Sequence, residues 1–191
     1  MTRRASMARS LGAAALLALC LACASAACRA QGTSGASEYA VKAAFLYKFL
    51  HFVEWPPPAF ADAHAPLVIG VLGSDRQAGE LAAAVEGRTA NGHPVATRRV
   101  QAGGPLTGLH VLFVGREHAL QVRHLLAAAR GQPLLVVTES EEAFAQGSTI
   151  NFVVVDEKVR FDIAVGPAEA RHLRISSRLL AVARRVIPAP S

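Results

Sequence analysis

Cysteine is nearly absent from this sequence, and the few cysteines are confined to its start. All three of them, Cys20, Cys23 and Cys28, lie within the first 30 of the 191 residues. A chain that begins at residue 31 would contain no disulfide and no thiol nucleophile, whereas one that begins at residue 27 would keep a single thiol, Cys28. The folded domain must therefore be stabilised by its core rather than by disulfides.

Clustered positive charge is also scarce once the first 30 residues are set aside. The whole chain carries a net charge of +6, but four of its 20 basic residues and none of its 14 acidic residues lie in that segment. The remainder, with 16 basic and 14 acidic residues, has a net charge of only +2. Its longest basic runs are the pairs Arg98-Arg99 and Arg184-Arg185. Binding to nucleic acid needs several clustered cations, so we expect no nucleic-acid partner.

Residues 1–30 have the pattern of a secretory signal peptide. Arginines near the start precede an apolar stretch from Leu11 to Leu21, and small residues follow through Ala30. The apolar stretch is shorter than the roughly 20 residues that a membrane-spanning helix needs. Cleavage after Ala26 and cleavage after Ala30 both fit, and either predicts export to the periplasm. Lipidation at Cys23 or Cys28 stays open as an alternative, although the residues before both cysteines match a lipobox poorly.

The rest of the chain is predicted to be one domain. Residues 31–37 are small and polar, and we expect them to form a flexible tail. Residues 38–187 then contain no linker and no internal repeat. A hydrophobic content of 52% is high enough for a folded core and excludes intrinsic disorder.

Three continuous apolar runs predict buried strands. They cover Leu67–Leu72, Val111–Val114 and Leu134–Val137, and the absence of alternation is typical of strands buried on both faces. Helical patterns over residues 76–86 and 117–130 follow the first and the second run. Strands that alternate with helices predict a mostly parallel sheet in a three-layer α/β sandwich.

The pattern changes toward the C-terminus. Residues 149–155 and 159–165 are predicted to be two strands joined by a tight turn, which gives an antiparallel hairpin at one edge of the sheet. A last helix is expected over Ser176–Val186. Its apolar stripe would consist of Ile175, Leu179, Val182 and Val186, with Arg184 and Arg185 in the final turn.

The first helix, expected over Glu38–Val53, is apolar over an unusually large part of its circumference. One apolar ridge, interrupted by Lys42, is enough to dock the helix on the sheet, and a second stripe lies beside it. Another element of the same domain could cover this second stripe, or a partner or a second copy could bind there. The candidate partner-binding residues are the stripe and the tryptophan at its rim, namely Val41, Phe45, Phe52 and Trp55.

No enzymatic site is evident in the sequence. None of the seven histidines has another histidine three or four residues away, so no metal site is expected. The sequence contains neither a phosphate-binding P-loop nor the Gly-x-Ser-x-Gly motif of a serine hydrolase. We therefore expect no catalytic residues, no cofactor and no metal.

One polar constellation could bind a small ligand instead. Ser74, Asp75, Arg116 and Glu139 follow the ends of three predicted strands, and ligands of open parallel sheets bind at the carboxyl ends of strands. Helix N-capping also explains Ser74 or Asp75 and is the favoured interpretation, with the ligand crevice as the alternative.

Two blocks of sequence resemble a known family. Glu38 to Phe49, continuing into Phe52-Val53-Glu54-Trp55-Pro56, resembles the opening of the YfiR family of periplasmic regulators. The block Leu173–Leu180 is similar to the end of the family pattern, and the likeness covers nearly all of residues 38–185.

The resemblance implies a non-enzymatic periplasmic protein that represses an inner-membrane diguanylate cyclase by binding its periplasmic part, and so controls cyclic di-GMP and biofilm formation. A homodimer stays open as a possibility, and contact with the membrane would be only through the partner. The alternative is a periplasmic small-ligand sensor that works with a histidine kinase or a transporter. Two features depart from the family pattern: Ala164 stands where an Asn is often found, and family disulfides have no counterpart.

Overall fold

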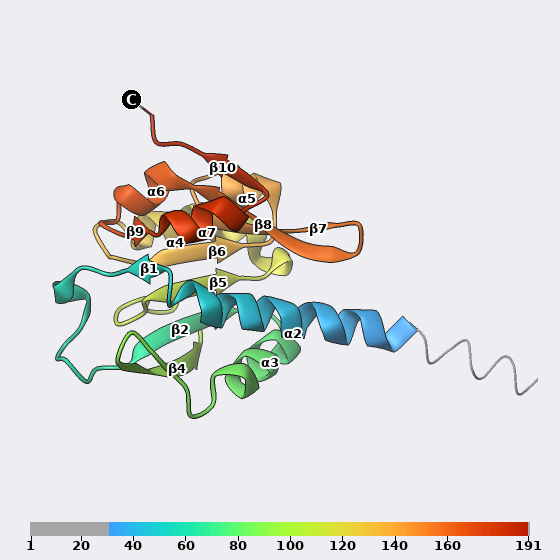
Figure 1. Cartoon of the computed structure of the whole chain (residues 1–191), viewed down its shortest axis with the longest axis horizontal. Helices are drawn as coiled ribbons and strands as arrows, with labels where there is room; N and C mark the ends of the chain where they lie inside the picture. The colour runs from blue at the N-terminus through green and yellow to red at the C-terminus, as the bar shows by residue number, and fades with distance from the viewer. Residues whose placement is uncertain (1–30, 191) are drawn as a thin grey trace, which may run out of the picture. The chain divides into compact units, whose positions relative to one another are not determined.

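Figure 1 shows the computed structural model, which describes residues 31–190 and, from Glu38 onward, their side chains. The predicted signal peptide, its two cleavage positions and its cysteines lie outside the described residues. The residues from Tyr39 onward form one compact unit. Helix α2 spans Gln31–Phe49 and so includes residues 31–37, which the sequence analysis assigned to a tail.

An eight-stranded mixed sheet forms the centre of the unit, in the order β10-β8-β7-β6-β5-β2-β4-β3 (Figure 1). The strands β4, β2, β5, β6 and β7 run parallel to one another, β7 and β8 form an antiparallel hairpin, and β10 runs parallel to β8. A separate two-stranded sheet pairs β1 with β9. The bounds are β1 Val53–Glu54, β2 Leu67–Leu72, β3 Thr89–Ala90, β4 His93–Arg99, β5 Val111–Val114, β6 Leu135–Thr138, β7 Ile150–Val155, β8 Lys158–Ala164, β9 Arg174–Ile175 and β10 Arg185–Ile187.

Helical segments cover both faces of the sheet. The longer ones alternate with the strands along the chain, which together with the sheet order confirms the predicted three-layer α/β fold. Besides α2, the helical segments are η1 Pro57–Ala59, α3 Asp75–Val85, η2 Arg116–Gln121, α4 Val122–Ala128, α5 Glu141–Ala145, α6 Val165–Glu169 and α7 Ser177–Val182.

The alternation of side chains along β5 divides the core into two clusters. Val111 and Phe113 belong to one cluster, together with residues of α2, α3 and α7. Leu112 and Val114 belong to the other, together with residues of α4 and α5. A strand that is buried on both faces needs apolar side chains at every position, which explains the continuous run in the sequence.

The prediction of a single helix over residues 117–130 is only partly correct. The first five residues of the segment belong to the 3₁₀ helix η2, which begins at Arg116, and the α-helix α4 begins at Val122. Gly115 precedes η2 and provides no side-chain cap, and the N–H of His118 donates to the Gly115 carbonyl across three residues, at 2.9 Å. The uncapped first turns therefore take the tighter geometry.

The prediction of a last helix over Ser176–Val186 is wrong in its second half. Helix α7 ends at Val182, Ala183 has an extended backbone, and the following residues form β10. Leu179 is buried as expected, but Val182 is 67% exposed. The local pattern is overridden because Arg184 and Arg185 bond to the buried carboxylate of Asp162 on β8, which draws the chain to the sheet edge.

The first helix also ends earlier than expected. The sequence predicts it to continue to Val53, whereas α2 ends at Phe49 and the N–H groups of the next three residues donate to carbonyl groups three residues earlier. Val53 then pairs with Ile175 in the small sheet. The backbone of this segment therefore bonds to a strand 120 residues away, and that partner is not visible in a local sequence pattern.

Candidate functional site

The described part of the domain contains an apolar groove between the C-terminal half of α2, strand β8 and helix α7. Its volume is about 560 Å³. We call it the aromatic groove, and it is lined by Phe45, Lys48, Phe49, His51, Phe52, Arg160, Phe161, Leu179 and Val182.

Phenylalanine rings form the floor of the aromatic groove. The ring of Phe45 meets that of Phe161 edge to face at 5.4 Å between centroids, and Phe49 meets Phe161 in the same way at 5.1 Å. Phe49 and Phe161 are buried, whereas Phe45 and Phe52 are half-buried. The groove is therefore the partly uncovered side of the core rather than a separate cluster.

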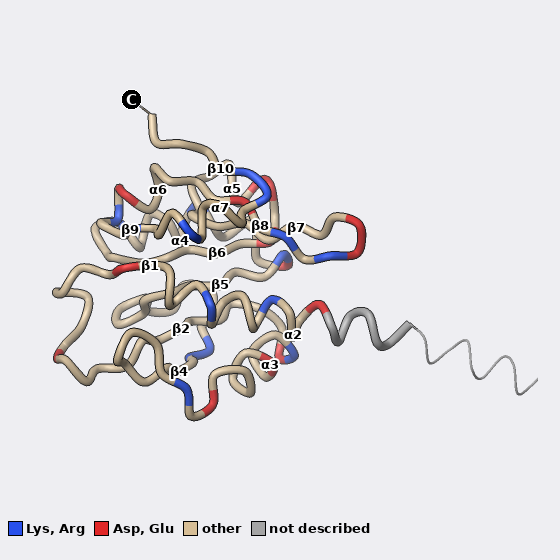
Figure 2. Tube along the Cα trace, viewed as in Figure 1, with Lys and Arg blue, Asp and Glu red and all other residues tan. Residues whose placement is uncertain are grey.

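Two positive charges lie beside this apolar floor. Lys48 on α2 and Arg160 on β8 are exposed, His51 after α2 is exposed as well, and no acidic residue lines the groove. The acidic residues of the β7–β8 hairpin lie at its tip, and Arg160 is on the returning strand (Figure 2). An apolar surface with a cationic rim favours a ligand or partner that is apolar and carries negative charge.

The structure places two of the four predicted partner-binding residues in the aromatic groove. Phe45 and Phe52 line it, whereas Val41 lies on α2 outside it and is 37% exposed. Trp55 is elsewhere: its Nε1 donates to the carbonyl oxygen of His110 at 3.1 Å, and its ring packs against that histidine. Trp55 thus fixes the segment after α2 to the sheet.

The sequence analysis missed the groove residues outside α2. In the sequence, Val159, Phe161, Ile163 and Val165 alternate with Arg160, Asp162 and Ala164, which predicts that Phe161 lies on the buried face of its strand. Val182 belongs to the apolar stripe expected for the last helix. Only the tertiary packing of β8 and α7 beside α2 brings these residues together. The alternation of apolar and other residues along β8 was the one signal in the sequence that pointed to Phe161, because it identified the side of the strand that faces a helix layer.

The alternative ligand crevice contains a network of polar side chains. Ser74 caps α3 in a capping box with Gln77, and the Nε2 of Gln77 donates to Glu139 at 3.3 Å. Asp75 pairs with Arg99, and both side chains are exposed. Arg116 is exposed on η2. Of the four predicted residues, only Ser74 and Glu139 are joined, through Gln77.

A buried ion pair accompanies this network. The Nζ of Lys42 lies 2.9 Å from the Oε1 of Glu139, and each side chain is only 5% exposed. Lys42 comes from α2 and Glu139 directly follows β6, so the pair ties the first helix to the end of the sheet. The lysine that interrupts the apolar ridge in the sequence therefore has a structural partner.

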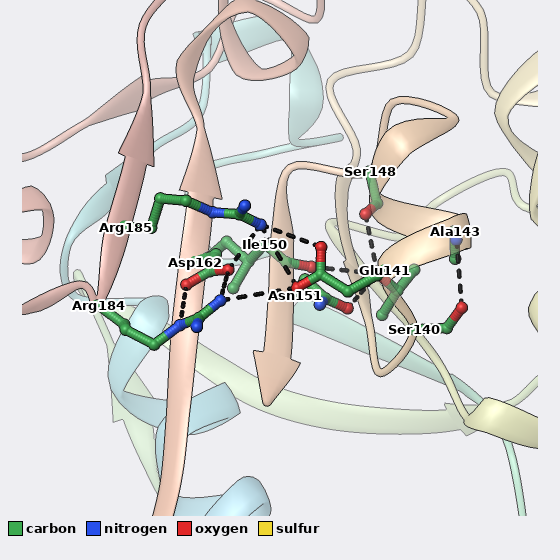
Figure 3. Close-up of polar contacts among 10 residues, drawn as sticks. Ser140, Glu141, Ala143, Ser148, Ile150, Asn151, Asp162, Arg184 and Arg185 are labelled. Atoms are coloured by element: carbon green, nitrogen blue, oxygen red, sulfur yellow. Dashed lines mark hydrogen bonds and ion pairs between the residues drawn. The ribbon is translucent and has the colours of Figure 1, made fainter. Parts of the chain in front are cut away.

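A second buried carboxylate holds the C-terminal strand (Figure 3). Asp162 on β8 is fully buried and accepts a hydrogen bond from the Nε of Arg184 at 2.8 Å, while the Nη2 of Arg185 lies 2.9 Å from it. The hydrogen bond to Asp162 raises the pKa of Arg184. Glu141 on α5 pairs with both arginines. We call these four residues the C-terminal clasp.

The described residues contain no candidate metal site and no candidate membrane span. No group of three or more His, Cys, Asp or Glu side chains among them could hold a metal ion. No helix in residues 31–190 combines the length and the apolar character that crossing a bilayer requires.

The fold and the groove define a small α/β domain with an apolar groove and no recognisable catalytic centre in its described part. A family model for YfiR/HmsC-like proteins, DUF4154, matches residues 39–184. The chain belongs to this family. Its members are regulators rather than enzymes, and membership supports a role in cyclic di-GMP signalling in general.

Two solved structures share low similarity with the chain. One is the ABC domain in complex with L-Trp from Streptococcus pneumonia, at 14% identity and a TM-score of 0.49, covering 63% of this chain and 55% of that one. The other is a conserved domain protein from Vibrio cholerae O1 biovar El Tor, at 12% identity and a TM-score of 0.47, with 62% and 54% covered. The chain thus spans about half the length of these structures. No curated protein matches the sequence.

Proposed function

We propose that this protein is a periplasmic regulator that represses an inner-membrane diguanylate cyclase by binding its periplasmic part through the aromatic groove. Family membership supports the signalling role. The observation that carries the mode of binding is the groove itself, an apolar surface of phenylalanine rings that the domain leaves partly uncovered. An apolar surface of this kind gains free energy when a partner covers it.

The occupant that fits the groove is an apolar segment of the partner flanked by acidic residues. Lys48, His51 and Arg160 would face those acidic residues, and the phenylalanine floor would receive the apolar side chains. A second copy of this protein is a poorer match, because its own groove would present the same positive charges. Repression would follow if the bound domain held the cyclase in an inactive arrangement.

The test uses Val182, because its side chain lines the groove and is 67% exposed, so that replacing it disturbs the core little. Phe45 is less suitable, since its ring packs against Phe49 and Phe161. The matched control is Leu120, which is 82% exposed on η2 and does not line the groove.

Cellular cyclic di-GMP is measured in the native host after deletion of the gene and after its complementation. We expect deletion to raise cyclic di-GMP, and the wild type and Leu120→Asp to restore the low level. Val182→Asp and Lys48→Glu/Arg160→Glu should fail to restore it at equal protein abundance. An unchanged cyclic di-GMP level on deletion would refute the cyclase assignment, and full restoration by Val182→Asp would refute the groove.

A further inference from the structure

A second pocket, which shares no residue with the aromatic groove, is surrounded by arginines. It has a volume of about 420 Å³ and lies between α4, the turn after α5 and the turn after α6. Three guanidinium groups line it, those of Arg123, Arg130 and Arg171, and no acidic residue does. We call it the arginine pocket.

The charge of the arginine pocket is not compensated within the described residues. None of its three arginines forms an ion pair with a carboxylate in residues 38–190. The two arginines of the C-terminal clasp, in contrast, share two carboxylates, Glu141 and Asp162. Three neighbouring cations without a counter-charge repel one another, so an anion bound among them would be stabilised.

Arg171 is the most constrained of the three cations. It is half-buried, and its Nη1 donates to the carbonyl oxygen of Pro167 at 2.9 Å, which holds the guanidinium beside the pocket. Burial lowers the pKa of Arg171, because the charged form is partly removed from water. A bound anion would offset this loss of hydration.

Helix dipoles explain only part of this arrangement. Arg130 and Arg171 follow the C-termini of α4 and α6, where a cation is favourable. Arg123, however, lies in the first turn of α4, where the dipole disfavours a cation. The convergence of the three on one pocket is therefore not accounted for by capping.

The remaining walls of the pocket suit a small organic group. Leu126 and Ala127 contribute apolar surface, and Gly131 and Gly147 line the pocket without side chains. Both glycines have positive φ, 72° and 110°, so larger residues are disfavoured there. The Oε1 of Gln146 is buried without a hydrogen-bond partner among the described residues, and it could accept a hydrogen bond from a ligand hydroxyl.

We infer that the arginine pocket binds an organic phosphate, with the phosphate among the three guanidinium groups and a small hydroxylated part against Leu126 and Gln146. Guanidinium groups bind phosphate through paired hydrogen bonds, and a dianionic phosphate matches the positive charge better than a single carboxylate does. The phosphate could belong to a free phosphate monoester or to a phospholipid headgroup. This inference does not depend on the proposed repression of a cyclase.

The test measures binding of glycerol 3-phosphate to the purified protein by calorimetry at low ionic strength. We expect binding that weakens as salt is added, and a loss of about tenfold or more in affinity for Arg171→Ala and for Arg123→Ala/Arg130→Ala. The double variant changes only exposed residues, so its folding is a minor concern. The control is Arg178→Ala, which removes an exposed arginine outside the pocket and should leave the affinity unchanged.

Two further measurements identify the source and the specificity of the ligand. Sedimentation with phosphatidylglycerol vesicles, if it depends on the same arginines, would support the pocket with a lipid headgroup as the ligand. Binding of glycerol 3-phosphate alone would support it with a free monoester. Absence of binding to both probes, acetate binding as tight as glycerol 3-phosphate binding, or full affinity in Arg123→Ala/Arg130→Ala would overturn the inference.

Discussion

Removal of one partner from the buried Lys42–Glu139 ion pair should strongly destabilise the domain. Lys42→Met would leave the carboxylate of Glu139, which is 5% exposed, with the Nε2 of Gln77 at 3.3 Å as its remaining described hydrogen-bond donor. Breaking a buried ion pair by removing one partner costs about 3–5 kcal/mol. Because whole domains are stabilised by only about 5–15 kcal/mol, this is a large fraction of the total.

The assay is urea unfolding of wild type, both single variants and the double variant Lys42→Met/Glu139→Gln. Each single variant should lose about 3–5 kcal/mol, which for a unit of this size lowers the melting temperature by about 6–20 °C. The double variant should be more stable than the sum of the single effects implies, because it buries no unpaired charge and its Gln still accepts from Gln77. Single-variant losses below about 1 kcal/mol, or additive losses, would refute the reasoning.

Three further perturbations test other parts of the structure. Burial lowers the pKa of His110, the charge of His93 lowers it further, and a backbone hydrogen bond at Ala59 opposes both. The imidazole of His110 therefore binds a proton more readily in the unfolded chain, and the free energy of unfolding should fall as pH drops below about 6.5. The free energy of unfolding should change less steeply with pH in His110→Phe, and equal slopes in the two proteins would contradict this. Asp162→Asn should lower the free energy of unfolding by about 2–3 kcal/mol and speed amide hydrogen exchange in β10, because Arg184 and Arg185 lose the charged acceptor at position 162. Unchanged hydrogen exchange in β10 would argue against the C-terminal clasp. Gly115→Ala would place a methyl group 2.7 Å from the Oε2 of Glu117 and 2.9 Å from the Oε1 of Gln77, and it should lower the free energy of unfolding by about 1–3 kcal/mol; an unchanged stability would show that both side chains move aside freely.

The sequence predicts the centre of the sheet well and its edges poorly. The bounds of β2 and β5 are those expected, because fully buried parallel strands leave continuous apolar runs. Strand β4 was not predicted, since His93–Arg99 is half-exposed and mixes polar with apolar residues. Strand β10 was mistaken for helix, because its position depends on Asp162, more than 20 residues earlier in the chain.

The sequence also predicts only some of the residues that line the aromatic groove. Helical periodicity identified Phe45 and Phe52 as surplus apolar residues of the first helix expected over Glu38–Val53, and both line the aromatic groove. It could not identify Phe161 and Val182, because a site built from three elements depends on tertiary packing. For Trp55, the sequence pattern suggested a partner contact where the structure shows an intramolecular one. A tryptophan next to an apolar stripe resembles an interface anchor, but the Nε1 of Trp55 donates to a backbone carbonyl and its ring packs against His110.

The C-terminal clasp also explains why helix α7 ends at Val182, although the sequence to Val186 favours a helix. The backbone becomes extended at Ala183, the N–H of Arg184 donates to the carbonyl oxygen of Phe161 at 2.9 Å, and its guanidinium bonds to Asp162. Val182, the last residue of the helix, lines the aromatic groove and remains exposed. The bonds that add β10 to the sheet therefore end the helix at a residue that lines the groove.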